Sequence, residues 1–217
     1  YHAGAEVGQG SHTVFAQFTA EALGLPIEKV ELRLSDTATS RNSGSVSASW
    51  MTFMSGNAIS GAAQQALERW QAGDRPAVGD FVYRPPATSP MDKADGHCYP
   101  NFAYGYVAEA VLAEVNTQTG EVRLKDVICA DDVGKAINPS LVEGQIEGGV
   151  VQAAGYTLME NFITHKGKTL TKELSTYLIP TSADIPEHVE SLILEYPDPI
   201  GPHGARGMGE MPYLPFV

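Results

Sequence analysis

Cysteine is scarce in this 217-residue sequence, which contains only Cys98 and Cys129. The two residues are far apart and form no Cys-x-x-Cys pair. This chain alone therefore cannot build a structural zinc site or a cysteine-ligated iron–sulfur cluster. We expect both cysteines to be buried, reduced thiols of a cytosolic protein.

Positive charge is also scarce, with 14 Lys and Arg against 26 Asp and Glu and a formal net charge of -12. Phosphate binding draws on clustered positive charge, so this balance works against nucleic acid or an anionic membrane as a partner. An anionic cofactor would have to be held by backbone amides instead. No apolar run reaches the roughly 18 residues of a membrane span, and no basic-then-apolar signal segment begins the chain. We therefore expect a soluble, cytoplasmic protein.

The composition, with 43% hydrophobic and 18% charged residues, is that of a globular chain with a sizeable core. We expect one region over residues 1–217, or two subdomains of about 1–100 and 101–217. The sequence begins at Tyr1 without an initiator Met and ends without a polar tail. We therefore expect a fragment, or one product of a split subunit whose upstream half lies elsewhere.

Hydrophobic periodicity in the first half predicts two helices and a strand. Apolar residues recur near helical spacing over residues 13–23, where Gly24 and Pro26 supply a stop. Alternating residues predict a strand over 30–34. Residues 40–49 form a Ser- and Gly-rich loop, and a second helix rich in small residues, typical of close packing, is predicted over 57–70. The proline-rich segment 75–101 is predicted to be a long surface connection.

The second half predicts a hairpin, a helix and a further strand. The hairpin joins residues 104–115 to an alternating segment around 122–125, with turn residues between them. A third helix is predicted over 139–160, where Ile146, Val150, Ala154 and Leu158 share one face. Glycines 144, 148 and 149 within it imply that something approaches the backbone closely. With a strand at 189–195, an α+β fold with mixed sheets fits best.

The first motif, Gly4-Ala5-Glu6-Val7-Gly8-Gln9-Gly10, directly precedes a predicted helix. Two glycines around a glutamine would let unshielded N–H groups and one amide side chain converge on an anion at the positive end of that helix. An ordinary Gly-rich turn has the same appearance. The motif matches neither a nucleotide triphosphate loop nor a dinucleotide fingerprint.

Two further motifs combine small residues with polar groups. Ser45-Val46-Ser47-Ala48-Ser49 offers a hydroxyl-lined loop whose backbone amides can face a bulky ligand, although a polar surface loop reads the same way. Gly144-Gln145-Ile146-Glu147-Gly148-Gly149, near the start of the third predicted helix, pairs one amide side chain with bare backbone. Helix packing is the alternative explanation for its glycines.

The fourth motif, Gly204-Ala205-Arg206-Gly207-Met208-Gly209-Glu210, places one carboxylate on a glycine turn. Such a carboxylate can approach a reacting centre and, if partly desolvated, act as a base. The alternative is an ordinary exposed glutamate. His12 and His203 flank motifs but stay unassigned, because lone histidines are more often structural than metal ligands.

Together and in this order, the four segments resemble the C-terminal half of the molybdenum hydroxylase large subunit, the family of xanthine dehydrogenase, aldehyde oxidase and carbon monoxide dehydrogenase. That family carries Gly-x-Glu-x-Gly-Gln-Gly, a Ser/Ala loop before Gly-x-Ala, Gly-Gln-x-x-Gly-Gly and a closing Gly-x-Gly-Glu. Asp131-Asp132-Val133-Gly134 and Ile137-Asn138-Pro139 also match it. The resemblance covers essentially the whole chain.

The resemblance implies a role for each matched residue. Gln9 and its glycine neighbours would hold the pterin cofactor, and Ala48 would present its backbone amide to a molybdenum ligand. Gln145 would hydrogen-bond a molybdenum oxo group or the pterin, and Glu210 would be the catalytic base. No side chain of this chain is expected to bind the metal directly. The expected cofactor-binding residues are Gly8, Gln9, Gly10, Ser47, Ala48, Ser49, Gln145 and Gly209.

The resemblance also implies cofactors and partners. The cofactor would be molybdopterin with molybdenum, in the cytosine dinucleotide form. Iron–sulfur clusters and FAD would sit on other subunits or domains, next to the remainder of the large subunit. Together these parts would hydroxylate a small-molecule aldehyde, N-heterocycle or similar carbon centre, with water as the oxygen source. The residues that shape the substrate pocket are expected upstream.

Two other functions stay open at this point. One is a non-catalytic or isolated scaffold domain that binds pterin or partner subunits without turnover, and molybdenum content would distinguish it from a catalytic component. The other is an unrelated nucleotide-binding α/β protein, which would depend on the first glycine motif alone. Binding of ATP or NAD would have to be shown for that function.

Overall fold

The computed structural model describes residues 1–216, which form two compact units. Unit 1 contains Tyr1–Gly105, Val133–Asn138 and Glu195–Gly207. Unit 2 contains Tyr106–Asp132, Pro139–Leu194 and the described residues from Met208 onward. Each unit combines segments that are distant in the sequence, so a cut near residue 100 separates only the first segment of unit 1.

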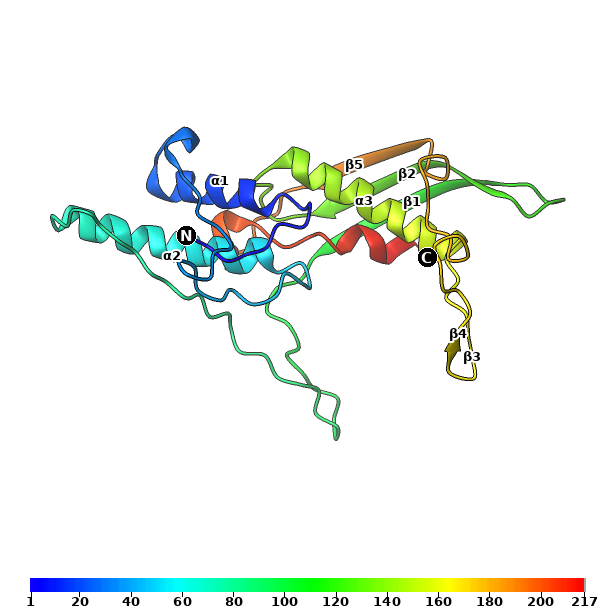
Figure 1. Ribbon diagram of the computed structural model, residues 1–217, viewed down its shortest axis with the longest axis horizontal. Coiled ribbons are helices and arrows are strands. Elements are labelled where there is room, and N and C mark those ends of the chain that lie inside the picture. Colours follow the sequence, from blue (N-terminus) through cyan, green and yellow to red (C-terminus); the bar gives the residue numbers. More distant parts are fainter. Residues whose placement is uncertain (217) are drawn as a thin grey trace. The chain divides into compact units, whose positions relative to one another are not determined.

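Unit 1 is built on two packed helices, α1 (Ser11–Leu23) and α2 (Met51–Gln71), drawn in blue and cyan in Figure 1. Short 3-10 helices, η1 (Ile27–Lys29) and η2 (Pro202–Gly204), complete its regular structure. The prediction of a helix over 13–23 is confirmed. It ends where Gly24 takes a left-handed conformation that favours glycine.

Gly56 explains how the two helices come together. A Cβ at this position would lie 2.8 Å from the Phe18 ring and 2.5 Å from Pro202 of η2. Phe18 is fully buried, so the missing side chain of Gly56 is filled by an aromatic ring and a proline. The close packing predicted from the small residues of α2 is confirmed.

Two predictions in this unit were wrong in detail. No strand forms over residues 30–34, where Leu34 makes a single bridge to His2 and the flanking Arg33 and Ser35 bond the same residue. Alternation indicated an extended segment, but a strand also needs a partner strand, and only His2 is available here. The second helix begins at Met51 rather than near residue 57, because Gly56 is a packing position and not a boundary.

The predicted connection over residues 75–101 is confirmed as irregular, and its one bridge joins Ser89 to Tyr99. Figure 1 shows it as a long green loop that leaves the end of α2. Phe81 in this loop packs over Gly61 of α2, where a Cβ would overlap its ring. This contact therefore fixes the first part of the loop to α2.

Unit 2 is built on a three-stranded sheet in the order β1-β2-β5. β1 (Tyr106–Val115) and β2 (Val122–Asp132) form the predicted antiparallel hairpin, while β5 (His188–Leu194) runs parallel to β2. A second, two-stranded sheet pairs β3 (Thr164–His165) with β4 (Lys168–Thr169). The mixed sheet and its helices confirm the predicted α+β class.

A bulge sets which side chains of β2 face the core. The register passes from Leu112–Asp126 to Ala113–Leu124, so Lys125 has no partner on β1. The extra residue lets Leu124 and Val127 lie on the same buried face. The alternation of apolar and polar residues in the sequence does not reveal this shift of register.

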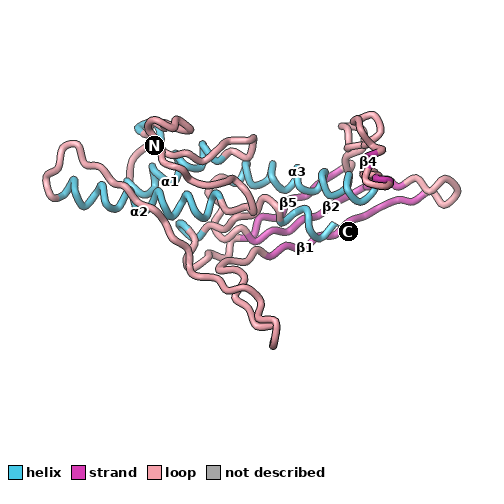
Figure 2. Tube along the Cα trace, turned by 60° about the horizontal axis from the view of Figure 1, so that its bottom comes forward, coloured by secondary structure: helices cyan, strands magenta, loops and turns pink. Residues whose placement is uncertain are grey.

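One face of the sheet is covered by α3 (Pro139–Leu158) and by the 3-10 helix η3 (Met211–Phe216). Figures 1 and 2 show α3 lying along the strands. Ile146 and Val150 are fully buried, as predicted, but Leu158 is 43% exposed. The predicted apolar face is therefore wrong at its end, because the core does not extend to the last turn of α3.

The glycines of α3 divide into two groups. A Cβ at Gly149 would lie 2.9 Å from Pro212 of η3, and one at Gly155 would overlap Pro180. Gly149 therefore confirms the predicted close approach to the backbone, and Gly155 is a further such position that was not predicted. Gly144 and Gly148 meet no atom of the described chain within 4 Å. For that pair the predicted close approach is not made by any described residue.

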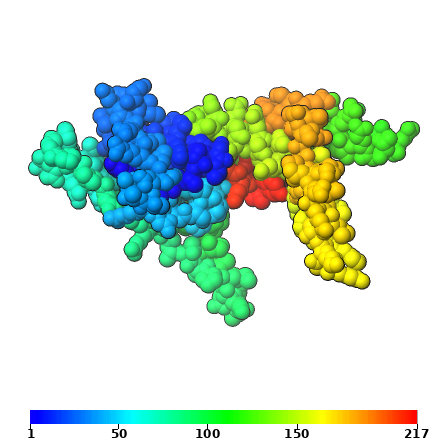
Figure 3. Space-filling model, in the orientation of Figure 1, coloured from blue at the N-terminus to red at the C-terminus, as the bar shows by residue number. Residues whose placement is uncertain are grey.

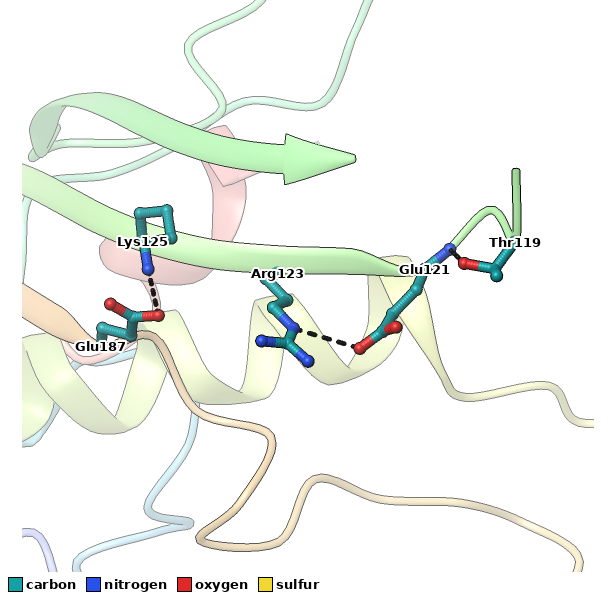
Figure 4. Close-up of polar contacts among 5 residues, drawn as sticks. All are labelled: Thr119, Glu121, Arg123, Lys125 and Glu187. Atoms are coloured by element: carbon teal, nitrogen blue, oxygen red, sulfur yellow. Dashed lines mark hydrogen bonds and ion pairs between the residues drawn. The ribbon is translucent and has the colours of Figure 1, made fainter. Parts of the chain in front are cut away.

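Ion pairs lie on the solvent-exposed part of β2 in unit 2. Figure 4 shows Arg123 paired with Glu121 at 3.1 Å, and Lys125 reaching Glu187 ahead of β5. Exposed pairs of this kind contribute little stability. Figure 3 shows the β3–β4 hairpin, in yellow, projecting from the rest of the unit. Within residues 1–216, no helix is both long and apolar enough to cross a membrane.

Candidate functional site

The first motif folds around its own carboxylate. Glu6 Oε1 accepts hydrogen bonds from the N–H groups of Gly8 at 2.8 Å and Gly10 at 2.9 Å, and Oε2 accepts one from His12 at 3.1 Å. Gly10 precedes α1 and His12 lies in its first turn. Glu6 therefore occupies the positive end of the helix, where an external anion was expected.

The electrostatics agree with this arrangement. Slight burial by itself would raise the pKa of Glu6, but the backbone hydrogen bonds from Gly10, His12 and Gly8 outweigh it and lower the pKa below its ordinary value. The carboxylate is thus the favoured form. The Gly8 and Gly10 amides are therefore not unshielded in this structure, because both donate to Glu6. Their predicted contact with the cofactor stays a prediction.

Gln9 is likewise held within the motif. Its Nε2 donates to the Ala5 carbonyl and the Ser11 hydroxyl, each at 2.9 Å, and its Oε1 accepts from the Val7 N–H at 2.7 Å. These three bonds tie both ends of the side chain to the loop. Gln9 shapes the approach to α1, and its predicted contact with the pterin stays a prediction.

The second motif has an unusual backbone. Ala48 and Ser49 both take left-handed conformations, with φ of 54° and 55°, directly before α2. This conformation costs a non-glycine residue about 1–2 kcal/mol. Residues held in this way often lie at binding sites, where the surrounding structure imposes them. The Ser45 and Ser47 hydroxyls hydrogen-bond each other at 3.1 Å in the same exposed loop.

Gly207 of the fourth motif lies against this loop. A Cβ at position 207 would overlap the Ser49 carbonyl oxygen. Glycine is therefore required for the two segments to approach. Unit 1 thus brings the Ser47–Ser49 loop together with the start of the closing motif, although they are far apart in the sequence.

An ion pair holds the closing segment in place. The Arg206 guanidinium lies 3.5 Å from the Asp198 carboxylate, and both side chains are largely buried. The Arg206 backbone N–H donates to the Val133 carbonyl at 2.9 Å. A Cβ at Gly134 would overlap the Gly204 carbonyl, so this second glycine lets the two segments touch. The Asp131–Gly134 stretch was matched to the family pattern in the sequence. Its last two residues, Val133 and Gly134, contact the fourth motif and support it.

The two histidines near the motifs have structural contacts. The His12 Nε2 lies 3.0 Å from the Gly4 carbonyl oxygen. His203 stacks on Phe18, with 5.8 Å between the ring centroids. Both contacts lie within unit 1.

Gln145 and Glu210 both belong to unit 2. Gln145 lies on α3, half-buried, one turn before Gly149. Pro212, two residues after Glu210, packs on Gly149. The close fit of η3 on α3 therefore brings the Glu210 turn to the same stretch of helix as Gln145.

Glu210 itself is exposed, as is Gly209, while the flanking Met208 and Met211 are buried. The two methionines anchor the turn and leave the carboxylate at the surface. The predicted role of Glu210 as a base requires partial desolvation, and residues 1–216 do not supply it. Its role as a base stays a prediction.

Comparisons with known proteins agree with these motifs. A family model described as a molybdopterin cofactor-binding domain matches residues 1–80 and 70–186. The chain belongs to this family. It is 29% identical over 237 aligned residues to the probable hypoxanthine oxidase XdhD of Escherichia coli strain K12, covering 96% of the chain and 25% of that relative.

Solved structures show the same relationship for this molybdopterin cofactor-binding domain. Aldehyde oxidoreductase from Desulfovibrio desulfuricans ATCC 27774 superposes with a TM-score of 0.84 and 30% identity, covering 95% of this chain and 24% of that one. Quinoline 2-oxidoreductase from Pseudomonas putida 86 gives 0.79 and 28%, covering 98% and 32%. The domain thus spans about a quarter to a third of these relatives.

The domain fits a cofactor held by backbone and amide groups. Gly144 and Gly148 leave the backbone of α3 bare beside Gln145, and the left-handed Ala48 and Ser49 turn the loop backbone before α2. In residues 1–216 no three His, Cys, Asp or Glu side chains are grouped to hold a metal ion. Backbone and amide donors suit an organic cofactor, which would bring its own redox chemistry.

Sequence reasoning missed Glu6 and a buried acidic pair, Glu109 and Asp131. Glu6 could have been found as a carboxylate four residues before Gly10, the residue that precedes α1. Glu109 interrupts an otherwise apolar run over residues 106–113, which is also visible in the sequence. The supporting glycines at 134 and 207 could not have been found, since their neighbours are distant in the sequence.

A polar hollow of about 310 Å³ lies at the tip of the β1–β2 hairpin. It contains none of the motif residues, and two of its lining residues form the exposed Arg123–Glu121 ion pair. It lies outside the candidate site. Its lining residues are Glu114, Val115, Asn116, Glu121 and Arg123.

Proposed function

We propose that this domain binds molybdopterin with molybdenum, in the cytosine dinucleotide form, as part of an oxidoreductase. The complete enzyme would hydroxylate an aldehyde, N-heterocycle or similar carbon centre, with water as the oxygen source. One observation carries the proposal: the strained Ala48–Ser49 backbone, held against Gly207 of the closing motif. Strain of this kind is retained where a surrounding structure imposes it.

The chain's own groups would bind and orient the cofactor. The Ser47 hydroxyl, the Ser49 side chain and the Ala48 backbone N–H supply donors from unit 1. Gln145 supplies an amide from α3 in unit 2, beside the bare backbone of Gly144. Neutral donors suit an anionic ligand here, because the chain carries a net charge of -12. The bound cofactor would supply the two-electron redox chemistry.

Glu210 would act as the base, taking a proton onto a carboxylate oxygen during the reaction. The turn between Met208 and Met211 fixes its position, because both methionines are buried. A base works best when water is excluded and its proton affinity is adjusted to the reaction. Glu210 is exposed in this domain, so the remaining part of the enzyme would have to cover it.

The proposal includes partners for this domain. Its relatives are three to four times longer, and the remainder of a large subunit would supply the substrate pocket. Electrons would leave through iron–sulfur clusters and FAD on other subunits or domains. Such an assembly would work in the cytoplasm.

The test is Glu210→Gln in the enzyme assembled with its remaining parts. We expect molybdenum content to be unchanged and turnover to fall by several orders of magnitude, since the amide cannot accept the proton. Glu121→Gln, at the exposed hairpin tip, is the matched control. This variant should keep both the molybdenum content and the turnover of the unchanged enzyme. Turnover like that of the unchanged enzyme would refute the assignment of the base.

A non-catalytic scaffold is the second candidate, and the Glu6 contacts favour it. The carboxylate already occupies the amides of Gly8 and Gly10, so the first motif serves the fold without a ligand. Metal analysis of the protein produced with cofactor biosynthesis separates the two candidates. Stoichiometric molybdenum supports the catalytic component, while a stable complex without molybdenum supports the scaffold.

A further inference from the structure

Four polar residues lie side by side on the buried face of the unit 2 sheet. Glu109 of β1 pairs in register with Cys129 of β2, which pairs with Ser191 of β5. Asp131 lies two residues beyond Cys129 on the same face of β2, so it is the diagonal neighbour of Glu109. Three strands therefore contribute to one polar cluster inside an apolar core.

The cluster is poorly satisfied. Asp131 is completely buried, and only its Oδ2 has a partner, the Cys129 thiol, which donates at 3.2 Å. The Asp131 Oδ1, both Glu109 carboxyl oxygens and the Ser191 hydroxyl are buried and make no hydrogen bond within residues 1–216. Unpaired carboxylates in such surroundings are strongly disfavoured.

The elements that cover this face bring no neutralising charge. The buried residues of α3 are apolar or glycine, and its acidic residues Glu143 and Glu147 are exposed. The buried residues of η3 are Met211, Pro212 and Phe216. Its Tyr213 is close to Tyr156 of α3, with 6.0 Å between the rings. Within the described chain, the charge of Asp131 adds to the effect of burial and raises the pKa of Glu109.

We propose that Glu109 and Asp131 form an internal proton-binding site, at which one of the two carboxyls keeps its proton while the other ionises. The folded core then carries one negative charge rather than two. Two carboxylates in low-dielectric surroundings repel each other, and protonation of one of them relieves this repulsion. The ligand of this site is a proton, and the site does not depend on the proposed cofactor role.

The direction of the titration agrees with the geometry. Burial, with the charge of Asp131 adding to it, raises the pKa of Glu109 from 4.5 to about 7. Burial also raises the pKa of Asp131, although the hydrogen bond from Cys129 opposes this. A carboxyl with a raised folded-state pKa stabilises the fold fully below its unfolded pKa. That stability is lost as the pH rises through about 7.

Carbon-13 NMR of the full chain, with the Glu and Asp side-chain carboxyls labelled, tests the site directly. We expect one carboxyl of the pair to stay protonated near neutral pH, after the exposed carboxyls have ionised. Asp131→Asn should lower the titration midpoint of Glu109, because the neighbouring charge is removed. If both resonances titrate together with those of the exposed carboxyls, the proposal is overturned.

Urea unfolding at several pH values between about 5 and 8 gives a second, independent measurement. The stability of the unchanged chain should fall across this range. Glu109→Gln removes the titrating group and should flatten the dependence of stability on pH. The free energy of unfolding of the variant should therefore rise relative to that of the unchanged chain as the pH rises. Glu114→Gln, an exposed position on the same strand, should keep the original slope. A Glu109→Gln curve parallel to that of the unchanged chain would overturn the proposal.

Discussion

Gly207 lies directly against the carbonyl oxygen of Ser49, at a distance that leaves no room for a side chain. The contact joins the loop before α2 to the segment that leads to Glu210. It also holds Ser49 where its backbone is left-handed. The geometry of the Ser47–Ser49 loop therefore depends on a glycine more than 150 residues away in the sequence.

Gly207→Ala should destabilise unit 1 and displace the loop. The new methyl group would meet backbone rather than a flexible side chain, and overpacking of this kind costs about 1–3 kcal/mol. Urea unfolding of the full chain measures the loss. The molybdenum content of the protein should fall as well, if the loop binds the cofactor. Unchanged stability would show that the contact with Ser49 is looser than described.

Gly148→Ala should have the opposite effect on stability. A Cβ there meets no atom of the described chain, and alanine is favoured over glycine in a helix by about 1 kcal/mol. The expected result is a higher unfolding midpoint together with a lower molybdenum content, because the bare backbone is lost. A variant that gains stability and keeps its molybdenum would exclude this face of α3 from cofactor binding.

Glu6→Ala should destabilise α1 by about 1 kcal/mol at neutral pH, because the amides of Gly8, Gly10 and His12 lose their shared acceptor. The pKa of Glu6 is lowered by those bonds, so its contribution is present above the unfolded value of 4.5 and disappears as the pH falls through the folded value. Unfolding curves of both proteins should converge in acid. A constant difference at every pH would contradict the carboxylate's role.

The two thiols should differ in reactivity. Cys129 is completely buried, and burial, followed by its hydrogen bond to Asp131, raises the pKa of the thiol. Cys98 is half-exposed in the long loop, which corrects the prediction that both cysteines are buried. A thiol reagent should label Cys98 in the native chain and Cys129 only after unfolding. Equal labelling rates would mean that unit 2 opens readily.

Local patterns predicted most of the regular structure. The first helix, the hairpin, the third helix and the last strand all carry their periodicity within a short window. The strand over 30–34 failed because pairing depends on a partner, and the start of α2 was misplaced because Gly56 was taken for a boundary. Lys125 shows the same limit, since a bulge is a property of two strands.

The candidate site could be predicted only as a set of residues. The order of the motifs located Ala48, Gln145 and Glu210, but the sequence could not show that Glu6 occupies the first motif. Nor could it show that Glu210 is exposed or that Glu109 lies beside Asp131. Each of these facts depends on which groups meet after folding.

The sequence by itself determined the class of this protein, its helices and its motif residues, because those properties are encoded in short segments and their order. The close approach of Gly207 to Ser49, the support of the Glu210 turn by Gly149 and the buried pair of Glu109 and Asp131 were decided only by the tertiary structure. All three join positions that are distant in the chain. Packing brings such positions together, and burial then sets which groups can bind a proton, a backbone or a ligand.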